Sequence, residues 1–180
     1  GELYVRAGGI ILGADVTMTN VELNLANKYH NAIYVNGYKF TANNVTRGSG
    51  SREVHLYAGG IGKETQVKTE LPASGANAVL SVTNSTFGDI FAAGVLKDFF
   101  GDVSITASGS NLGNVYASGT SDREPDGNWF DTSEPAAPDA NAWYIVGGAV
   151  SVTTDGSSIT NVNAMGNSKV TVTVNNALES

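Results

Sequence analysis

Two stretches of this chain repeat one another over 17 residues without a gap. Residues 103–119 and 150–166 are identical at nine of these positions, and most of the remaining differences are conservative. A third copy is recognised at residues 80–94 and is two residues shorter at the turn. Self-similarity of this kind is the signature of a fold built from stacked structural units.

The closing half of the unit recurs more widely than the whole. It reads apolar, any, small or apolar, small or polar, glycine, and it ends at intervals of about 26 residues. The matching segments are residues 33–37, 56–60, 90–94, 115–119 and 162–166, with looser copies at 5–9 and 144–148.

Each unit contains two short segments in which apolar and polar residues alternate. In the copy at 103–119 this period places Leu112, Val115 and Ala117 on the inner face and Tyr116 on the outer face. Strands this short bury an apolar face only when successive units stack, about 4.8 Å apart. The nearest approach to a helical pattern, residues 21–29, also fits alternation.

The repeat predicts an all-β, single-domain parallel β-helix (β-solenoid) over residues 1–180. We expect a right-handed winding of roughly six or seven short coils, interrupted by two inserted loops. A β-sandwich is the competing interpretation, because short strands with frequent turns fit it too.

Composition excludes several classes of protein. The chain has no cysteine and only two histidines, so disulfides and thiolate metal sites are excluded and a histidine-rich metal site is not expected. Its net charge of −7 disfavours binding to nucleic acid. No apolar run approaches the ~20 residues that a membrane span needs, so we expect no membrane insertion.

The recurring unit Val-x-Val-Thr…Asn-Val-Tyr-Ala-x-Gly resembles β-helix repeats in large secreted or cell-surface proteins of bacteria. This resemblance implies an adhesin-like, non-catalytic structural or adhesive module. It also implies that the chain is excised from a longer protein and that its partners are glycans or proteins of a host or neighbouring cell.

Two insertions, at about residues 61–76 and 120–142, interrupt the repeat. The second carries six acidic residues against one arginine, which is −5 of the net charge of −7. Its oxygen-bearing residues at alternate positions are typical of the start of a calcium loop. The candidate Ca²⁺ ligands are Asp122, Glu124, Asp126, Asn128 and Asp131. The alternative is an acidic surface loop that binds no metal.

The same region holds both tryptophans of the chain. Aromatic rings on a β-scaffold stack on sugar rings, while neighbouring polar groups bond the hydroxyls. The candidate glycan-binding or protein-binding residues are Trp129, Phe130, Trp143 and Tyr144. The alternative is that these rings hold the loop against the flank of the domain.

Two further functions are weaker alternatives. A carbohydrate-active enzyme, of the polysaccharide lyase or glycoside hydrolase type, requires converging carboxylates and bases. The candidates appear scattered, so we expect no enzyme; they are Asp89, Asp98, Asp102, Arg47, Arg52, His55 and Lys97. An ice-binding solenoid requires a regular hydroxyl array, for which the pairs are Ser81/Thr83, Ser104/Thr106 and Ser151/Thr153, with Thr17/Thr19 and Thr171/Thr173 similar.

Overall fold

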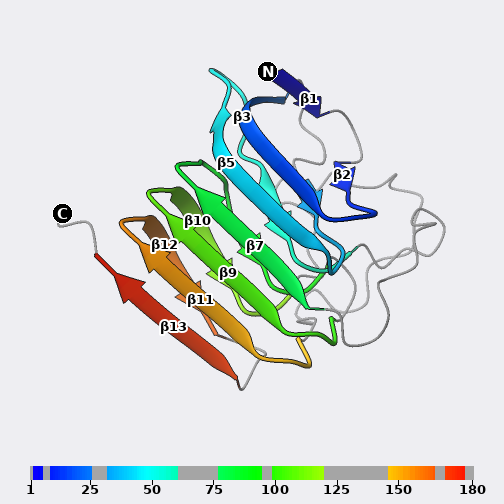
Figure 1. Ribbon diagram of the computed structural model, residues 1–180, viewed down its shortest axis with the longest axis vertical. Coiled ribbons are helices and arrows are strands. Elements are labelled where there is room, and N and C mark those ends of the chain that lie inside the picture. Colours follow the sequence, from blue (N-terminus) through cyan, green and yellow to red (C-terminus); the bar gives the residue numbers. More distant parts are fainter. Residues whose placement is uncertain are drawn as a thin grey trace, which may run out of the picture.

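A computed structural model describes residues 2–5, 9–25, 32–60, 77–94, 99–119, 146–164 and 169–176. These residues form thirteen β-strands and no helix (Figure 1). A seven-stranded sheet contains β1 (Glu2–Val5), β3 (Val16–Leu25), β5 (Lys39–Arg47), β7 (Ala78–Thr83), β9 (Val103–Ser108), β11 (Val150–Asp155) and β13 (Val170–Asn175). A six-stranded sheet contains β2 (Ile10–Ile11), β4 (Ala32–Tyr34), β6 (His55–Tyr57), β8 (Ile90–Phe91), β10 (Asn111–Tyr116) and β12 (Ser158–Asn163).

Every pairing between these strands is parallel. The chain alternates between the two sheets, and each new strand pairs with the one two elements earlier, for example β9 with β7 and β10 with β8. The prediction of an all-β fold with parallel strands is confirmed. The competing β-sandwich is wrong for these residues, because the strands of that fold pair antiparallel.

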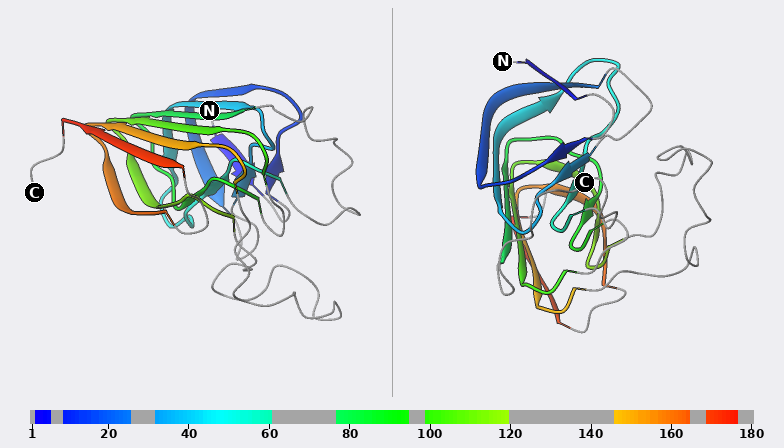
Figure 2. Two further views of the ribbon diagram at one scale, coloured as in Figure 1. Left: turned by 90° about the horizontal axis from the view of Figure 1, so that it is seen from below. Right: turned by 90° about the vertical axis from the view of Figure 1, so that its right-hand side faces the viewer.

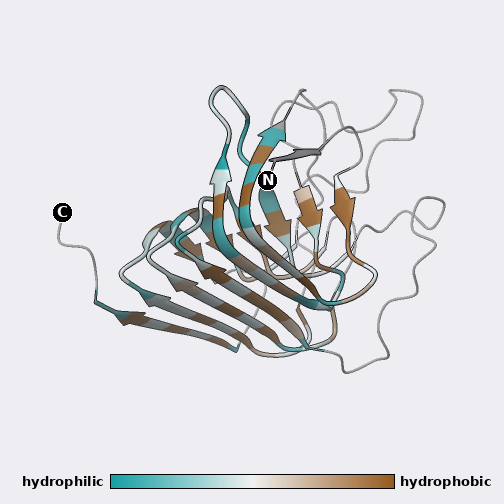
Figure 3. Ribbon diagram, turned by 45° about the horizontal axis from the view of Figure 1, so that its top comes forward, coloured by the Kyte–Doolittle hydropathy of each residue, from teal (hydrophilic) through white to brown (hydrophobic). Residues whose placement is uncertain are grey.

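The core lies between the two sheets, which Figure 2 shows as two layers. One inward row of the seven-stranded sheet comprises Val16, Phe40, Leu80, Ile105, Val152 and Val172. The facing row of the six-stranded sheet comprises Ile10, Ile33, Leu56, Ile90, Val115 and Val162. The long strands therefore carry hydrophobic and hydrophilic bands in alternation (Figure 3). The predicted inward positions Leu112, Val115 and Ala117 are buried, as expected.

A column of left-handed residues forms a corner at a bend within β3 and β5 and directly after β7, β9, β11 and β13. Its members are Asn20, Asn44, Asn84, Gly109, Gly156 and Asn176, all with φ between 46° and 56°. Asparagine and glycine are the residues that adopt this conformation at low cost. The corner therefore depends on residue type, and the Asn/Gly turns of the sequence specify it.

A ladder of serine hydroxyls lies directly after this corner. Ser110 is 1% exposed; its Oγ donates to the Ser108 carbonyl at 2.9 Å and accepts the Ser85 amide N–H at 3.1 Å. Ser85 bonds Thr83 O and the Val45 N–H in the same way. At the bend these backbone N–H groups donate to serine hydroxyls instead of to the carbonyl of a neighbouring strand. Buried N–H groups need such a partner.

Register corrects two details of the predicted repeat. Ala78 pairs with Val103 and Leu80 with Ile105, so the third copy begins at residue 78 and has the full 17-residue length. The loose copy at residues 5–9 is wrong, because Val5 pairs with Leu25 in the seven-stranded sheet while Ile10 occupies the equivalent position.

Residues 16–25 form a strand, which removes the helical interpretation there. The insertions at 61–76 and 120–142 lie outside the described residues.

Candidate functional site

The site residues predicted from the sequence lie outside the described part of the chain. This applies to the aromatic set Trp129, Phe130, Trp143 and Tyr144, and to the candidate Ca²⁺ ligands Asp122, Glu124, Asp126, Asn128 and Asp131. Both hypotheses stay predictions. Among the residues that the structure does describe, no group of three or more acidic or histidine side chains is placed to hold a metal ion.

A column of stacked aromatic rings runs along the outer face of the six-stranded sheet. Tyr34 stacks on Tyr57, Tyr57 on Phe91 and Phe91 on Tyr116, with centroid distances of 5.1, 4.6 and 4.9 Å. The rings of the last two pairs are nearly parallel, with interplanar angles of 8° and 7°. The next position in this row is Asn163 on β12. The column of rings therefore ends at Tyr116.

A row of hydrogen-bonded polar side chains runs beside the rings. Asp89 Oδ1 accepts hydrogen bonds from the Asn114 backbone N–H at 2.7 Å and from Asn114 Nδ2 at 3.0 Å. Asn161 Nδ2 in turn donates to Asn114 Oδ1 at 3.1 Å. A side chain at Gly113 would meet Asp89 Oδ1 at 2.5 Å, so glycine at this position leaves room for the carboxylate.

Both rows follow from the alternation of side chains along a strand, because the two neighbours of each inward aliphatic residue point outward. The residue before it belongs to the polar row, as in His55-Leu56, Asp89-Ile90 and Asn114-Val115. The residue after it belongs to the aromatic row, as Tyr57, Phe91 and Tyr116 do. This pattern was available in the sequence, but it is visible only when the polar, apolar and aromatic residues are taken as one recurring triplet.

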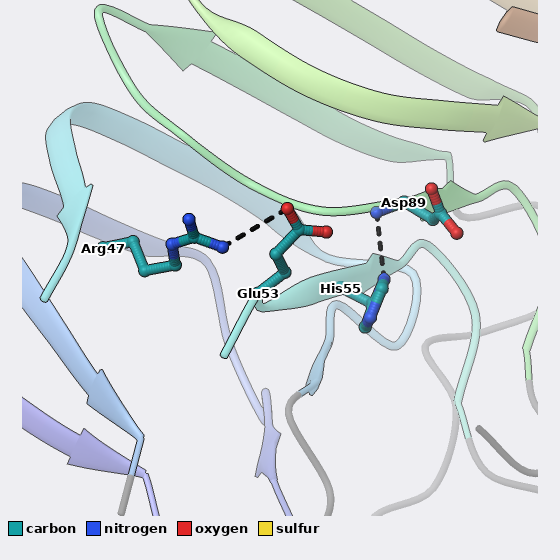
Figure 4. A network of polar contacts seen from close by, with 4 residues as sticks. All are labelled: Arg47, Glu53, His55 and Asp89. Atoms are coloured by element: carbon teal, nitrogen blue, oxygen red, sulfur yellow. Dashed lines mark hydrogen bonds and ion pairs between the residues drawn. The ribbon is translucent and has the colours of Figure 1, made fainter. Parts of the chain in front are cut away.

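His55 begins the polar row, and Figure 4 shows how it meets Asp89. The Asp89 backbone N–H donates to His55 Nδ1 at 2.9 Å, while the Asp89 carboxylate points away from the imidazole (Figure 4). Burial lowers the pKa of His55 from its ordinary value of 6.5, although the carboxylates of Asp89 and Glu53 act in the opposite direction. Glu53 also forms an exposed ion pair with Arg47 at 3.3 Å.

A shallow depression lies where the aromatic column ends. It has a volume of about 390 Å³ and is lined by Asn114, Tyr116, Asn161, Val162, Asn163 and Ala164. Burial, together with the Asp89 carboxylate, raises the pKa of the Tyr116 hydroxyl from its ordinary value of 10, so the group stays protonated at neutral pH. An aromatic ring bordered by amide groups is a chemically suitable surface for a sugar ring with its hydroxyls.

The catalytic candidates that the structure describes do not form one group. His55 and Asp89, which appeared scattered in the sequence, lie side by side. Asp102 precedes β9 in the other sheet, and its Oδ1 accepts the Ala149 amide N–H at 2.8 Å. Arg47 pairs with Glu53, and Arg52 is exposed. Lys97 and Asp98 lie outside the described residues.

The outer face of the seven-stranded sheet carries a row of hydroxyl side chains. Register aligns Thr17, Thr41, Ser81, Thr106, Thr153 and Thr173 in a single row. The predicted pairing of Ser81 with Ser104 is wrong, because Ser104 pairs with Val79 and Ser151. Threonine is favoured on any solvated sheet face. The ice-binding alternative stays a prediction.

We expect the stability of the protein to fall as the pH drops from 7.5 to 5.5, because of His55. Its pKa is lower in the folded chain than in the unfolded chain, so the unfolded state binds more protons in this range. The dependence of the free energy of unfolding from one such group is at most about 1.4 kcal/mol per pH unit. Urea denaturation of the wild type at several pH values measures it.

His55→Asn and His30→Gln are the control variants for this prediction. An asparagine oxygen replaces the acceptor at Nδ1 without titrating, so His55→Asn should flatten the pH dependence. His30→Gln removes the other histidine of the chain, so the contribution of His30 to the pH dependence is measured separately. If the wild type and His55→Asn respond equally to pH, His55 is not the titrating group.

Comparison of the chain with protein-family models, with curated proteins and with solved structures found no match. No helix in the described part of the chain has the length and apolar character needed to cross a bilayer.

Proposed function

We propose that this chain is part of a right-handed parallel β-solenoid and acts as a non-catalytic, glycan-binding module of a secreted or cell-surface bacterial protein. The regular alternation between seven-stranded and six-stranded parallel sheets supports six or seven coils. Right-handed winding follows the strong preference of parallel crossover connections. The resemblance to β-helix repeats of bacterial surface proteins supports the location.

One observation carries the binding function: the aromatic column and the polar row end together at the depression beside Tyr116. A sugar ring that stacks on Tyr116 would take the place of the next ring in the column. Amide groups of Asn114, Asn161 and Asn163 border the same space and suit hydroxyl groups.

The described carboxylates support a binding role over a catalytic one. Asp89 Oδ1 already accepts two hydrogen bonds from Asn114, and Asp102 Oδ1 accepts the Ala149 amide. Each of these oxygens is engaged by N–H groups of the protein itself, whereas a general acid or base must be within reach of the substrate. These two side chains are therefore better suited to holding the structure than to transferring protons.

Replacing Tyr116 with alanine is expected to weaken glycan binding by about tenfold or more, because the stacking surface is lost. Binding of short chitin and cellulose oligosaccharides, measured by calorimetry, tests this. Tyr116→Phe keeps the ring and should retain most of the affinity. A thermal melt of each variant shows that the fold is intact.

Trp129→Ala separates the depression from the loop predicted in the sequence. If Tyr116→Ala binds as the wild type does, the depression is not the glycan site. If binding is lost only in Trp129→Ala, the site lies in the loop at residues 120–144. If neither oligosaccharide binds to the wild type, the glycan-binding function itself is wrong.

A further inference from the structure

The side-chain hydrogen bonds of the polar row beside Tyr116 all run the same way, with each NH₂ group donating toward Asp89. The Asp89 carboxylate determines this direction. An ionised carboxylate only accepts hydrogen bonds, so Asn114 must present its NH₂ group to Asp89. The Asn114 oxygen is then left for the next member of the row, and it accepts the NH₂ group of Asn161. Amide orientations are ambiguous in isolation, but a charged acceptor at one end determines every orientation that follows.

The direction of the row determines what it offers at the depression. Once the Asn161 NH₂ group points back to Asn114, the Asn161 Oδ1 is the terminal group of the row. Asn161 is exposed and lines the depression together with Tyr116. Among the described residues none donates a hydrogen bond to this oxygen. The row therefore ends in a hydrogen-bond acceptor beside the stacking surface.

We propose that this site selects sugars that carry an acetamido group over the same sugars with a hydroxyl in its place. This inference rests on the proposed glycan-binding function and names its ligand class. The N–H of an acetamido group would donate to Asn161 Oδ1, which repeats the contact that joins Asn161 to Asn114. A secondary amide N–H donates and never accepts, so it matches an acceptor whose direction is already set.

The rest of the lining supports the same ligand class. Val162 and Ala164 border the depression beside the asparagines and provide apolar surface. The acetyl methyl group would find apolar contact there, whereas a hydroxyl in its place has no methyl group to bury. Hydrogen bonds from N–H groups to the Asp89 carboxylate are stronger than neutral ones, which holds the row in its direction.

The test compares oligosaccharides of N-acetylglucosamine and of glucose with equal chain length and linkage. We expect the wild type to bind the acetamido form about tenfold more tightly. Asn161→Ala removes the acceptor and should reduce this preference to near unity, because the acetamido form loses more affinity than the glucose form does. Because Asn161 is exposed, we expect this change to leave the fold intact, and a thermal melt checks it.

Asp89→Asn tests the direction of the row from a distance. An asparagine at this position keeps an oxygen for the Asn114 backbone N–H, but its amide allows Asn114 and Asn161 to reverse. The preference for the acetamido sugar should therefore fall, whereas Tyr116→Ala should weaken both sugars by the same factor. If Asp89 had only a structural role, Asp89→Asn would not change the preference between the two sugars.

The outcomes separate this inference from the function on which it rests. Equal affinity of the wild type for the two sugars, or a preference that Asn161→Ala and Asp89→Asn leave unchanged, overturns the inference and leaves glycan binding standing. Binding that is unaffected by Tyr116→Ala shows that the depression is not the glycan site and overturns the inference. Absence of binding for both sugars overturns the proposed function and the inference together.

Discussion

Replacing Phe40 with alanine is expected to lower the free energy of unfolding by about 3–5 kcal/mol. The Phe40 side chain is fully buried between the two sheets, and its ring meets the Phe87 ring edge-on at a centroid distance of 6.0 Å. Parallel pairing to β3 and β7 holds the backbone on both sides, so the cavity has little freedom to collapse. Urea denaturation followed by circular dichroism measures the loss.

Phe100→Ala is the matched control for this experiment. Phe100 has 72% of its surface exposed, so its removal should change stability by no more than about 0.5 kcal/mol. The same chemical change is thus compared at a buried and at an exposed position. Equal losses in the two variants would show that Phe40 does not lie in the core.

Gly94→Ala is the second change with a large expected effect, a loss of about 3 kcal/mol. A Cβ atom at Gly94 would overlap the carbonyl oxygen of Gly60, which follows the neighbouring strand β6. The reverse contact is equally close, because a Cβ at Gly59 would lie 2.6 Å from the Gly94 nitrogen. Backbone atoms on both sides have no rotamer to change, so the two backbone segments would have to move apart.

Gly147→Ala controls for the change from glycine itself. There the nearest atom to the added Cβ is the Phe100 side chain at 3.1 Å, and this exposed ring has room to move. We expect a loss below about 1 kcal/mol. Urea denaturation midpoints of Gly94→Ala and Gly147→Ala compare the two losses of stability. Equal midpoints would contradict the close approach of Gly60 and Gly94.

The recurring apolar position was predictable from the sequence, but the register of the third repeat was not. Residues 33, 56, 90, 115 and 162 were matched by their pattern and lie in one row. Ser81, in contrast, was matched to Ser104, whereas it pairs with Thr106. A shift of two residues keeps each side chain on the same face of the sheet, so alternation does not exclude it. The left-handed corner at Asn84 and Gly109 is what selects the observed register.

The candidate site was missed for a related reason. His55 and Asp89 are 34 residues apart, whereas Asp89 and Asn114 are 25 apart, so their spacing shows no common period. The insertion at 61–76 lies within the longer interval and leaves the pairing of Leu56 with Ile90 intact. Only that pairing shows that the polar residues and the aromatic residues each form a row.

Local alternation and turn chemistry determined the all-β class, the inward rows and the Asn/Gly corners from the sequence by itself, because each depends on neighbouring residues alone. The tertiary structure decided which residues pair across the insertions. Pairing depends on backbone hydrogen bonds between strands and on close contacts such as that of Gly60 with Gly94, and neither leaves a fixed spacing in the sequence. The aromatic column and the directed polar row are consequences of that pairing.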